Sequence, residues 1–175
     1  MNRLRGSGYR EKGQFDLALA DFAKALAIDP ANPRTYANRG LTYIRRGQFD
    51  LAVSDLNESI RLEPKAESFY YRGSALLELE TYEAAIADFT QAIGLQPPFV
   101  DAVRLRGQAY ALKGDYAAAI ADLDQFIGPE PSTNGDAFAH YLRGLSHSRL
   151  GHREEALRDL RRALQLTRDA ELPQK

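Results

Sequence analysis

Five Arg-Gly pairs lie at nearly constant intervals along the 175-residue chain. Their arginines are Arg5, Arg39, Arg72, Arg106 and Arg143. The successive spacings are 34, 33, 34 and 37 residues. A period of about 34 residues is typical of arrays of two-helix repeats, in which each repeat packs mainly against its neighbours. The chain is therefore expected to fold as such an array, a form that presents surface and seldom houses catalysis.

Each Arg-Gly pair is followed in the same repeat by an alanine and, three residues after it, an aspartate. The alanines are Ala18, Ala52, Ala85, Ala119 and Ala156, and the aspartates are Asp21, Asp55, Asp88, Asp122 and Asp159. A large apolar residue follows each aspartate directly and another comes four residues later, as Phe22 and Leu26 do in the first repeat. These offsets place apolar side chains on one face of a helix. Two helices per repeat are therefore predicted, ten in all, in an all-α chain.

Turn residues mark the expected helix ends. In four repeats a glycine stands where the first helix should end in a left-handed residue. These glycines are Gly13, Gly47, Gly114 and Gly151, and Glu80 takes the place in the third repeat. Proline, which disrupts a helix interior, should close the second helix of four repeats. These prolines are Pro30, Pro64, Pro97 and Pro131, whereas Arg168 holds the place in the fifth repeat, so the last helix is expected to run on toward Pro173.

The pattern closely resembles that of the tetratricopeptide repeat (TPR) family, which pairs a small residue in one helix with an alanine in the next. Here these residues are the five glycines that follow the arginines and the five alanines. The resemblance implies a right-handed superhelical α-solenoid of helix-turn-helix repeats that forms a single domain over residues 1–175. Its repeats would span about residues 1–32, 33–65, 66–99, 100–136 and 137–170, with a short tail at 171–175. It also implies a noncatalytic scaffold or adaptor that binds a peptide or helix of a partner protein in its concave groove.

Charge and composition narrow the classes of partner. The 23 basic and 24 acidic residues give a net charge of -1 and are interleaved along the chain, so neither nucleic acid nor an anionic membrane is an expected partner. No apolar run is long enough to span a bilayer, and a chain without cysteine has neither disulfides nor thiolate metal sites. The first residues lack the apolar segment of a secretion signal, which leaves the cytoplasm as the default location.

The arginines and aspartates allow two interpretations. Five arginines in one register could form a row that binds phosphate or carboxylate groups. Pairing of the two helices in each repeat would instead bring every arginine beside an aspartate, and this structural ion-pair ladder is the favoured interpretation. Its central members are Arg39 with Asp55, Arg72 with Asp88 and Arg106 with Asp122. Removing one partner of a partly buried pair should cost on the order of 3 kcal/mol.

The resemblance implies that the first helices of the repeats line the concave groove, and the helical period then selects candidate peptide-binding residues. These candidates are Arg34, Asn38, Arg45, Tyr70, Tyr71, Arg104, Gln108 and Tyr141. Tyrosine and arginine often anchor protein interfaces, although Tyr71 could equally pack against a neighbouring repeat. Because the N-terminal part of the set is basic, the expected ligand is a peptide with acidic and apolar positions.

Some TPR proteins hold the terminal carboxylate of a chaperone peptide with two basic and two asparagine-type residues from three repeats. At the matching positions this chain carries Arg3, Ser7, Asn38, Glu67 and Tyr71. Only Asn38 fits, with Arg3 as a stand-in. An internal segment of a partner is therefore favoured over a chaperone C-terminus.

Catalytic chemistry has little support in the sequence. His140 and His147 are seven residues apart, which exceeds the i, i+4 spacing at which one helix supplies two metal ligands. His147 occupies a position that is tyrosine in three other repeats, so it is expected to be a core residue with one hydrogen bond. No phosphate-binding loop is recognisable. No catalytic residue, cofactor or metal is predicted.

The connection at residues 128–136 accounts for the longest repeat spacing. It is rich in Gly, Pro, Ser and Asn and is expected to be a solvated loop, with Asp136 or Asn134 capping the next helix. Beyond it, Leu164, Leu166 and Leu172 could be left partly uncovered, because the end of a solenoid usually needs a polar outer face. Assembly through the end repeats, with another copy or with the rest of a longer polypeptide, is therefore the alternative function. A frayed but soluble end would explain the same residues.

Overall fold

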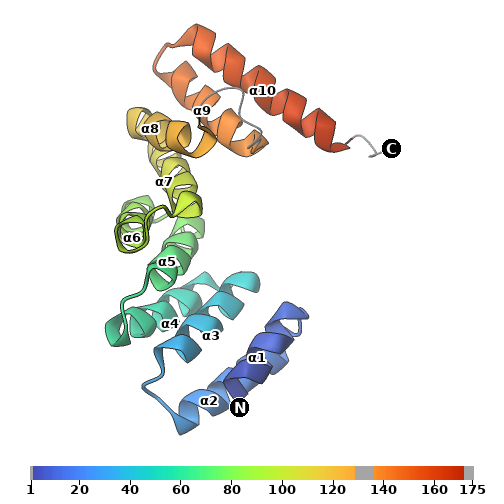
Figure 1. Cartoon of the computed structure of the whole chain (residues 1–175), viewed down its shortest axis with the longest axis vertical. Coiled ribbons are helices and arrows are strands. Elements are labelled where there is room, and N and C mark those ends of the chain that lie inside the picture. Colours follow the sequence, from blue (N-terminus) through green and yellow to red (C-terminus); the bar gives the residue numbers. More distant parts are fainter. Residues whose placement is uncertain (1, 129–135, 172–175) are drawn as a thin grey trace. The chain divides into compact units, whose positions relative to one another are not determined.

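The computed structural model describes residues 2–128 and 136–171, and within these ranges the chain forms ten helices and no strand (Figure 1). The helices are α1 (Asn2–Glu11), α2 (Phe15–Ile28), α3 (Pro33–Arg45), α4 (Phe49–Leu62), α5 (Ala66–Glu78), α6 (Tyr82–Leu95), α7 (Val100–Lys113), α8 (Tyr116–Ile127), α9 (Ala137–Arg149) and α10 (Arg153–Glu171). The prediction of an all-α chain with two helices in each repeat is confirmed.

The chain divides into two compact units, Met1–Pro97 and Pro98–Lys175, termed the N-terminal and C-terminal units. In the N-terminal unit α1 packs against α2, α3 against α4, and α5 against α6, and the pairs are joined by α2–α3 and α4–α5 contacts. In the C-terminal unit α7 packs against α8 and α9 against α10, with α8 and α9 forming the joint. Each pair is a helical hairpin closed by a short turn (Figure 1).

The turn inside each hairpin contains one residue with positive φ. Gly47 has φ of 72°, its amide donates to Ile44 at 2.9 Å, and the hairpin then continues into α4. Glu80 has φ of 57° and donates in the same way to Leu77 at 3.0 Å. The left-handed conformation costs a residue with a Cβ about 1 kcal/mol. The third repeat therefore keeps the turn of the other repeats with a strained glutamate in place of glycine.

Close approach within each hairpin depends on the glycine that follows the arginine. A Cβ added to Gly73 would lie 2.9 Å from the Phe89 ring, and one added to Gly40 would lie 2.9 Å from Leu56. The residue that fills the space beside glycine is thus the large apolar one after the aspartate, and not the alanine alone, as the family pattern had suggested. Ala52 is fully buried and contributes a backbone carbonyl near Gly40.

The helix boundaries follow the sequence signals. Asn32 caps α3, because its side chain accepts a hydrogen bond from the Thr35 amide at 3.1 Å. Asp136 caps α9 by accepting from the amide of Phe138 at 2.9 Å. Helix α10 continues past Arg168 to Glu171, as the missing proline at that place predicted. Pro131, Asn134, Leu172, Pro173 and the predicted tail from residue 172 onward lie outside the described residues.

Candidate functional site

Every repeat contains the same bidentate ion pair between its two helices. In the second repeat Arg39 donates through Nε and Nη2 to the two carboxylate oxygens of Asp55, both at 2.7 Å. The other four pairs have the same geometry, with distances between 2.6 and 2.8 Å: Arg5–Asp21, Arg72–Asp88, Arg106–Asp122 and Arg143–Asp159. The hydrogen bonds that Arg39 donates to Asp55 raise the pKa of Arg39, although burial opposes the shift. These arginines join the two helices of a hairpin, and their Nε and Nη2 groups are already bound to carboxylate oxygens.

The fifth ion pair differs from the others in its surroundings. Arg39 and Arg72 lie over aromatic rings three residues earlier in their helices, at 5.8 and 5.6 Å from the ring centroids. In α9 the corresponding residue is His140, which is buried and whose Nδ1 lies 3.0 Å from the Asp159 carboxylate. Burial raises the pKa of Asp159, but hydrogen bonds from Arg143 and His140 outweigh it and hold the pKa below its ordinary value.

The core histidine is therefore His140, and the expectation for His147 needs correction. His147 is only half-buried, and its Nδ1 lies 3.2 Å from Nδ1 of His152, across the turn between α9 and α10. The register explains the difference. A residue three positions before the arginine faces the aspartate of the partner helix, whereas one four positions after it lies beside the turn.

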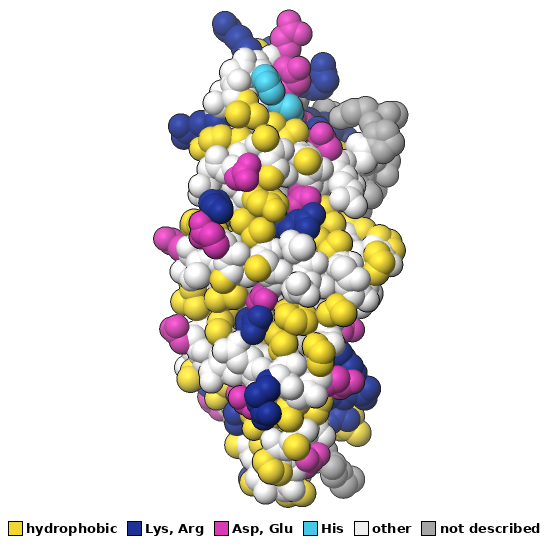
Figure 2. Space-filling view, turned by 90° about the vertical axis from the view of Figure 1, so that its left-hand side faces the viewer, with side chains coloured by type: hydrophobic (Ala, Val, Ile, Leu, Met, Phe, Trp, Pro, Cys, Tyr) yellow, Lys and Arg dark blue, Asp and Glu magenta, His cyan; other side chains and the backbone are white. Residues whose placement is uncertain are grey.

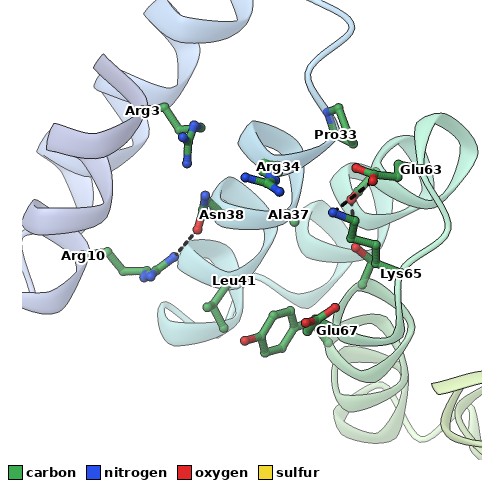
Figure 3. Close-up of a pocket in the computed structure, with 13 residues that line it drawn as sticks. Arg3, Arg10, Pro33, Arg34, Ala37, Asn38, Leu41, Glu63, Lys65 and Glu67 are labelled. Atoms are coloured by element: carbon green, nitrogen blue, oxygen red, sulfur yellow. Dashed lines mark hydrogen bonds and ion pairs between the residues drawn. The ribbon is translucent and has the colours of Figure 1, made fainter. Parts of the chain in front are cut away.

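The N-terminal unit contains a groove of about 330 Å³ along its first helices (Figure 3). Its lining residues come from α1, α3, α5 and the end of α4: Arg3, Arg10, Pro33, Arg34, Ala37, Asn38, Leu41, Ser59, Glu63, Lys65, Glu67, Ser68 and Tyr71. This surface is termed the N-terminal groove. Arg3, Arg34 and Asn38 point into the space between α1 and α3, with Leu41 below them (Figure 3).

The cations of the N-terminal groove differ in how they are neutralised. Arg10 donates through Nη1 to Asn38 at 2.9 Å and through Nη2 to Glu11 at 2.8 Å. These hydrogen bonds and the charge of Arg10 lower the pKa of Glu11. Lys65 forms an ion pair of 2.9 Å with Glu63. By contrast, the guanidinium groups of Arg3 and Arg34 make no ion pair or side-chain hydrogen bond with any described residue.

Sequence and structure comparisons identify the architecture. A tetratricopeptide repeat model matches residues 37–98 and 70–134, which together cover more than half of the chain. The chain belongs to the tetratricopeptide repeat family. Models described as TPR repeat and tetratricopeptide repeat also match residues 6–45 and 137–170. No curated protein matches the chain.

Solved TPR structures superpose on nearly the whole chain. A crystal structure of MamA is 31% identical with a TM-score of 0.84, covering 95% of this chain and 97% of the MamA chain. YrrB, described as a TPR protein with an unusual peptide-binding site, is 23% identical with a TM-score of 0.83, covering 96% of this chain and 86% of YrrB. The first TPR of Spaghetti (RPAP3), bound to the HSP90 peptide SRMEEVD, is 28% identical with a TM-score of 0.61, covering 62% and 86% of the two chains.

Within the TPR framework, the predicted groove residues fall into distinct environments. Arg34, Asn38 and Tyr71 line the N-terminal groove, and Tyr71 also packs against the apolar core of α4 and α5. Arg45 is the last residue of α3, exposed and outside this lining. Tyr70 is half-buried, with its ring centroid 6.2 Å from that of Phe89 in α6. Tyr70 does not line the N-terminal groove, but its ring centroid lies 5.5 Å from that of Tyr71, which does, so its part in peptide binding stays a prediction.

Three groove residues that lie outside the first helices were not predicted from the sequence. Glu63 and Lys65 come from the connection between α4 and α5, and Ser59 comes from α4. The helical period gives no orientation for the residues of a connection. A usable signal was the oppositely charged Glu-Pro-Lys sequence directly before α5.

The remaining candidates belong to the C-terminal unit. The Arg104 Nε lies 3.6 Å from the Asp136 carboxylate, and the guanidinium lies 5.8 Å from the Phe126 ring centroid. Gln108 is half-buried on α7. Tyr141 is exposed and stacks on Phe138, with 6.3 Å between ring centroids. Arg104 is therefore partly neutralised, whereas Tyr141 is open to solvent.

Tyr141 belongs to an apolar depression of about 570 Å³ between α9 and α10. Its main side chains are Phe138, Tyr141, Leu160, Ala163 and Leu164, and this surface is termed the C-terminal apolar surface. Basic and acidic side chains are dispersed among apolar ones over the face that Figure 2 presents. No helix of the described ranges combines the length and apolar character needed to cross a bilayer. Among the same residues, no group of three or more His, Asp or Glu could hold a metal ion.

Proposed function

We propose that this TPR chain is a noncatalytic adaptor whose N-terminal groove binds a peptide segment with acidic and apolar positions. The observation that carries the proposal is the pair of guanidinium groups, Arg3 and Arg34, that line the groove without an ionic partner among the described residues. The five arginines of the ion-pair ladder, by contrast, are each bound to a carboxylate of the partner helix. Unpaired arginines in a concave surface offer fork-shaped donors that match a carboxylate.

The groove also offers apolar contact beside the cations. Leu41 and the Tyr71 ring lie in the same lining as Arg34, one on α3 and the other on α5. An acidic side chain near Arg3 and Arg34, followed by an apolar side chain over Leu41 and Tyr71, would use both features. The affinity would then come from a few anchors and not from the total contact area.

A relative supports a peptide of acidic character. The first TPR of Spaghetti (RPAP3) is bound to a peptide that ends in Glu-Glu-Val-Asp. Glu67 stands in this groove and would repel an added carboxylate near α5. The favoured ligand is therefore an internal segment whose acidic positions lie toward α1 and α3, because Arg3 and Arg34 are on those helices.

The test is a binding titration with a short peptide that has a leucine after a run of glutamates. Its control is the same peptide with glutamine in place of every glutamate. Arg3→Ala combined with Arg34→Ala should weaken binding of the acidic peptide at least about tenfold, because two charge-assisted contacts are lost. Arg61→Ala, which removes an exposed arginine of α4 outside the groove, should leave the affinity unchanged. Equal affinity for the acidic and neutral peptides would contradict the proposal.

The C-terminal unit supports a second candidate function, assembly with another protein through the C-terminal apolar surface. Contiguous exposed apolar side chains commonly mark interaction sites. Phe138, Tyr141 and Leu164 are all exposed in this surface.

A further inference from the structure

The C-terminal apolar surface corresponds to the part of the fourth repeat against which the next helix, α9, packs. An offset of 37 residues relates the fourth and fifth repeats, so Leu160 and Leu164 correspond to Leu123 and Ile127. Ile127 is only 1% exposed and shares a buried cluster with residues of α9, whereas Leu164 is 64% exposed. The surface therefore has residue types that a helix covers in the fourth repeat, whereas no helix of the described residues covers them here.

The α8–α9 joint in the C-terminal unit shows how such a helix is held. Ala139 and Leu142 of α9 form one buried cluster with Leu123 and Ile127 of α8. The docking face of α9 is thus a small residue followed three positions later by leucine. Apolar burial of this kind supplies most of the attraction between two amphipathic helices.

A polar contact lies directly beside this apolar cluster. The residue after Leu142, Arg143, donates through Nη1 to Asp124 of α8 at 2.8 Å. In the N-terminal unit the corresponding Arg72 of α5 donates through Nη1 to Asn57 of α4 at 2.7 Å. The arriving helix therefore places an arginine against an oxygen of the helix that receives it.

The charge at this position is reversed on α10. Arg161 stands 37 residues after Asp124 and therefore takes its place. It is exposed and has no hydrogen bond or ion pair with any described residue. Arg158, one turn earlier, and Arg162, its neighbour, line the same face of α10. An arriving helix with arginine beside its leucine would be repelled here, whereas a carboxylate would be attracted.

We propose that the C-terminal apolar surface binds an amphipathic helix of a partner protein that carries a small residue, a leucine three positions later and an acidic residue directly after the leucine. The apolar residues would cover Leu160 and Leu164, and the carboxylate would pair with Arg161. This inference rests on the second candidate function, and it is independent of peptide binding in the N-terminal groove.

A second copy of the chain offers an exposed leucine but meets neither the small-residue requirement nor the charge requirement, because the residue three positions before Leu4 is Met1. Leu4 of α1 is 68% exposed and directly precedes Arg5, in the order of the Leu-Arg pair that docks on α8. A copy docked head-to-tail would bring Arg5 against Arg161. Repulsion between these charges disfavours self-association through this face.

The first experiment measures binding of a labelled peptide with the sequence of residues 136–149, in which Glu replaces Arg143, by fluorescence anisotropy. The unchanged peptide is the reference. The full chain should bind the Glu peptide at least about tenfold more tightly, Arg161→Glu should reverse the preference, and Leu164→Gln should weaken binding of both peptides. Arg153→Glu, at the start of α10 and outside the lining of this face, is the matched charge control and should leave the preference unchanged. Arg34→Ala should have no effect, which separates this site from the groove.

The second experiment measures the mass of the full chain by light scattering over a range of concentrations. The wild-type chain should remain a monomer. Arg161→Asp should produce growth of mass with concentration, because Arg5 of a second copy then gains a partner, and Leu4→Asn should abolish that growth. Wild-type association that Leu164→Gln abolishes would assign the surface to a second copy and overturn the proposal. Peptide binding that is unchanged in Arg161→Glu would overturn it as well.

Discussion

The two units are held by the same ion pairs but by different joints between hairpins. At the α4–α5 joint of the N-terminal unit, the hydroxyl groups of Ser59 and Ser68 are buried and 2.9 Å apart. At the α8–α9 joint of the C-terminal unit, Ala139 occupies the position of Ser68, and Leu142 packs in the apolar cluster. The same ion pair within each hairpin is thus compatible with either polar or apolar contacts between neighbouring hairpins.

The joint chemistry has a consequence for the exposed surfaces. Ser59 and Ser68 lie in the lining of the N-terminal groove, so the polar joint forms part of the floor beneath its cations. The residue types that form the apolar joint recur on α9 and α10 as the C-terminal apolar surface. One fold therefore presents two surfaces with different chemistry.

The largest expected effect is loss of an ion pair, and it should be greater in the C-terminal unit. Asp159→Asn should cost about 4 kcal/mol and Asp88→Asn about 3 kcal/mol of unfolding free energy, because each leaves a partly buried arginine without its counter-ion. Asp159 also accepts from His140, so its loss affects a second buried group. Hydrogen exchange, read helix by helix, measures each unit in the intact chain. Equal losses would mean that His140 adds nothing.

Acid should weaken the same pair. The folded pKa of Asp159 lies below its ordinary value, so its stabilising contribution is complete above about pH 4, near the unfolded pKa. That contribution is lost as the pH falls through the lower folded pKa. The hydrogen-exchange protection of amides in α9 and α10 should therefore fall as the pH is lowered in the wild-type chain. The pH dependence should be flatter in Asp159→Asn, and an unchanged slope would contradict the assignment.

The two joints should respond differently to truncation. Leu142→Ala should cost about 3 kcal/mol, because it leaves a cavity among Leu123 and Ile127. Ser68→Ala should cost about 1 kcal/mol, since it leaves the buried Ser59 hydroxyl without its partner. The double change of Ser59 and Ser68 to alanine should be nearly neutral, because no polar group is then unsatisfied. Chemical denaturation of the three variants measures these losses of unfolding free energy. A large loss in the double variant would contradict the role given to the Ser59–Ser68 hydrogen bond.

The repeats, turns and ion pairs could be predicted because they depend on local periodicity. In each of the five ladder pairs the arginine and the aspartate are 16 residues apart, so one hairpin geometry applies to all five. The groove was harder to predict. Tyr70 and Tyr71 are neighbours, yet one faces Phe89 and the other lines the groove. One residue corresponds to about 100° around a helix, so a small error in phase exchanges the two roles.

Partners supplied from outside the first helices were not predictable from periodicity. Lys65 and Glu63 come from a connection, and Asp136 reaches Arg104 from the N-cap of another hairpin. The contact between His140 and Asp159 was not predicted either, because His147, and not His140, stands at the position that is tyrosine in other repeats. Contacts of this kind depend on how hairpins approach one another, which a single repeat does not specify.

A smaller effect is expected from adding a methyl group at the two kinds of helical glycine. At Gly144 a Cβ would lie 3.0 Å from Leu160 and 3.2 Å from the carbonyl oxygen of Ala156, and a backbone atom cannot move aside. Gly144→Ala should therefore cost about 2 kcal/mol. At Gly8, in α1, nothing lies within 4 Å, so Gly8→Ala should add up to about 1 kcal/mol through helix propensity. Thermal denaturation of both variants gives the sign, and a stabilising Gly144→Ala would contradict the packing.

The smallest expected effect concerns the turns, where the third repeat of the N-terminal unit departs from the fifth repeat of the C-terminal unit. Glu80 has φ of 57° and Gly151 has φ of 80°, in equivalent turns. Glu80→Gly should stabilise the chain by about 1 kcal/mol, because glycine adopts this conformation without strain. Gly151→Ala should destabilise it by a similar amount, since a Cβ at Gly151 meets nothing within 4 Å and only the backbone conformation resists it. Urea denaturation should show opposite shifts of the midpoint. If Glu80→Gly lowered the midpoint, the glutamate side chain would have to stabilise the turn by more than its strain costs.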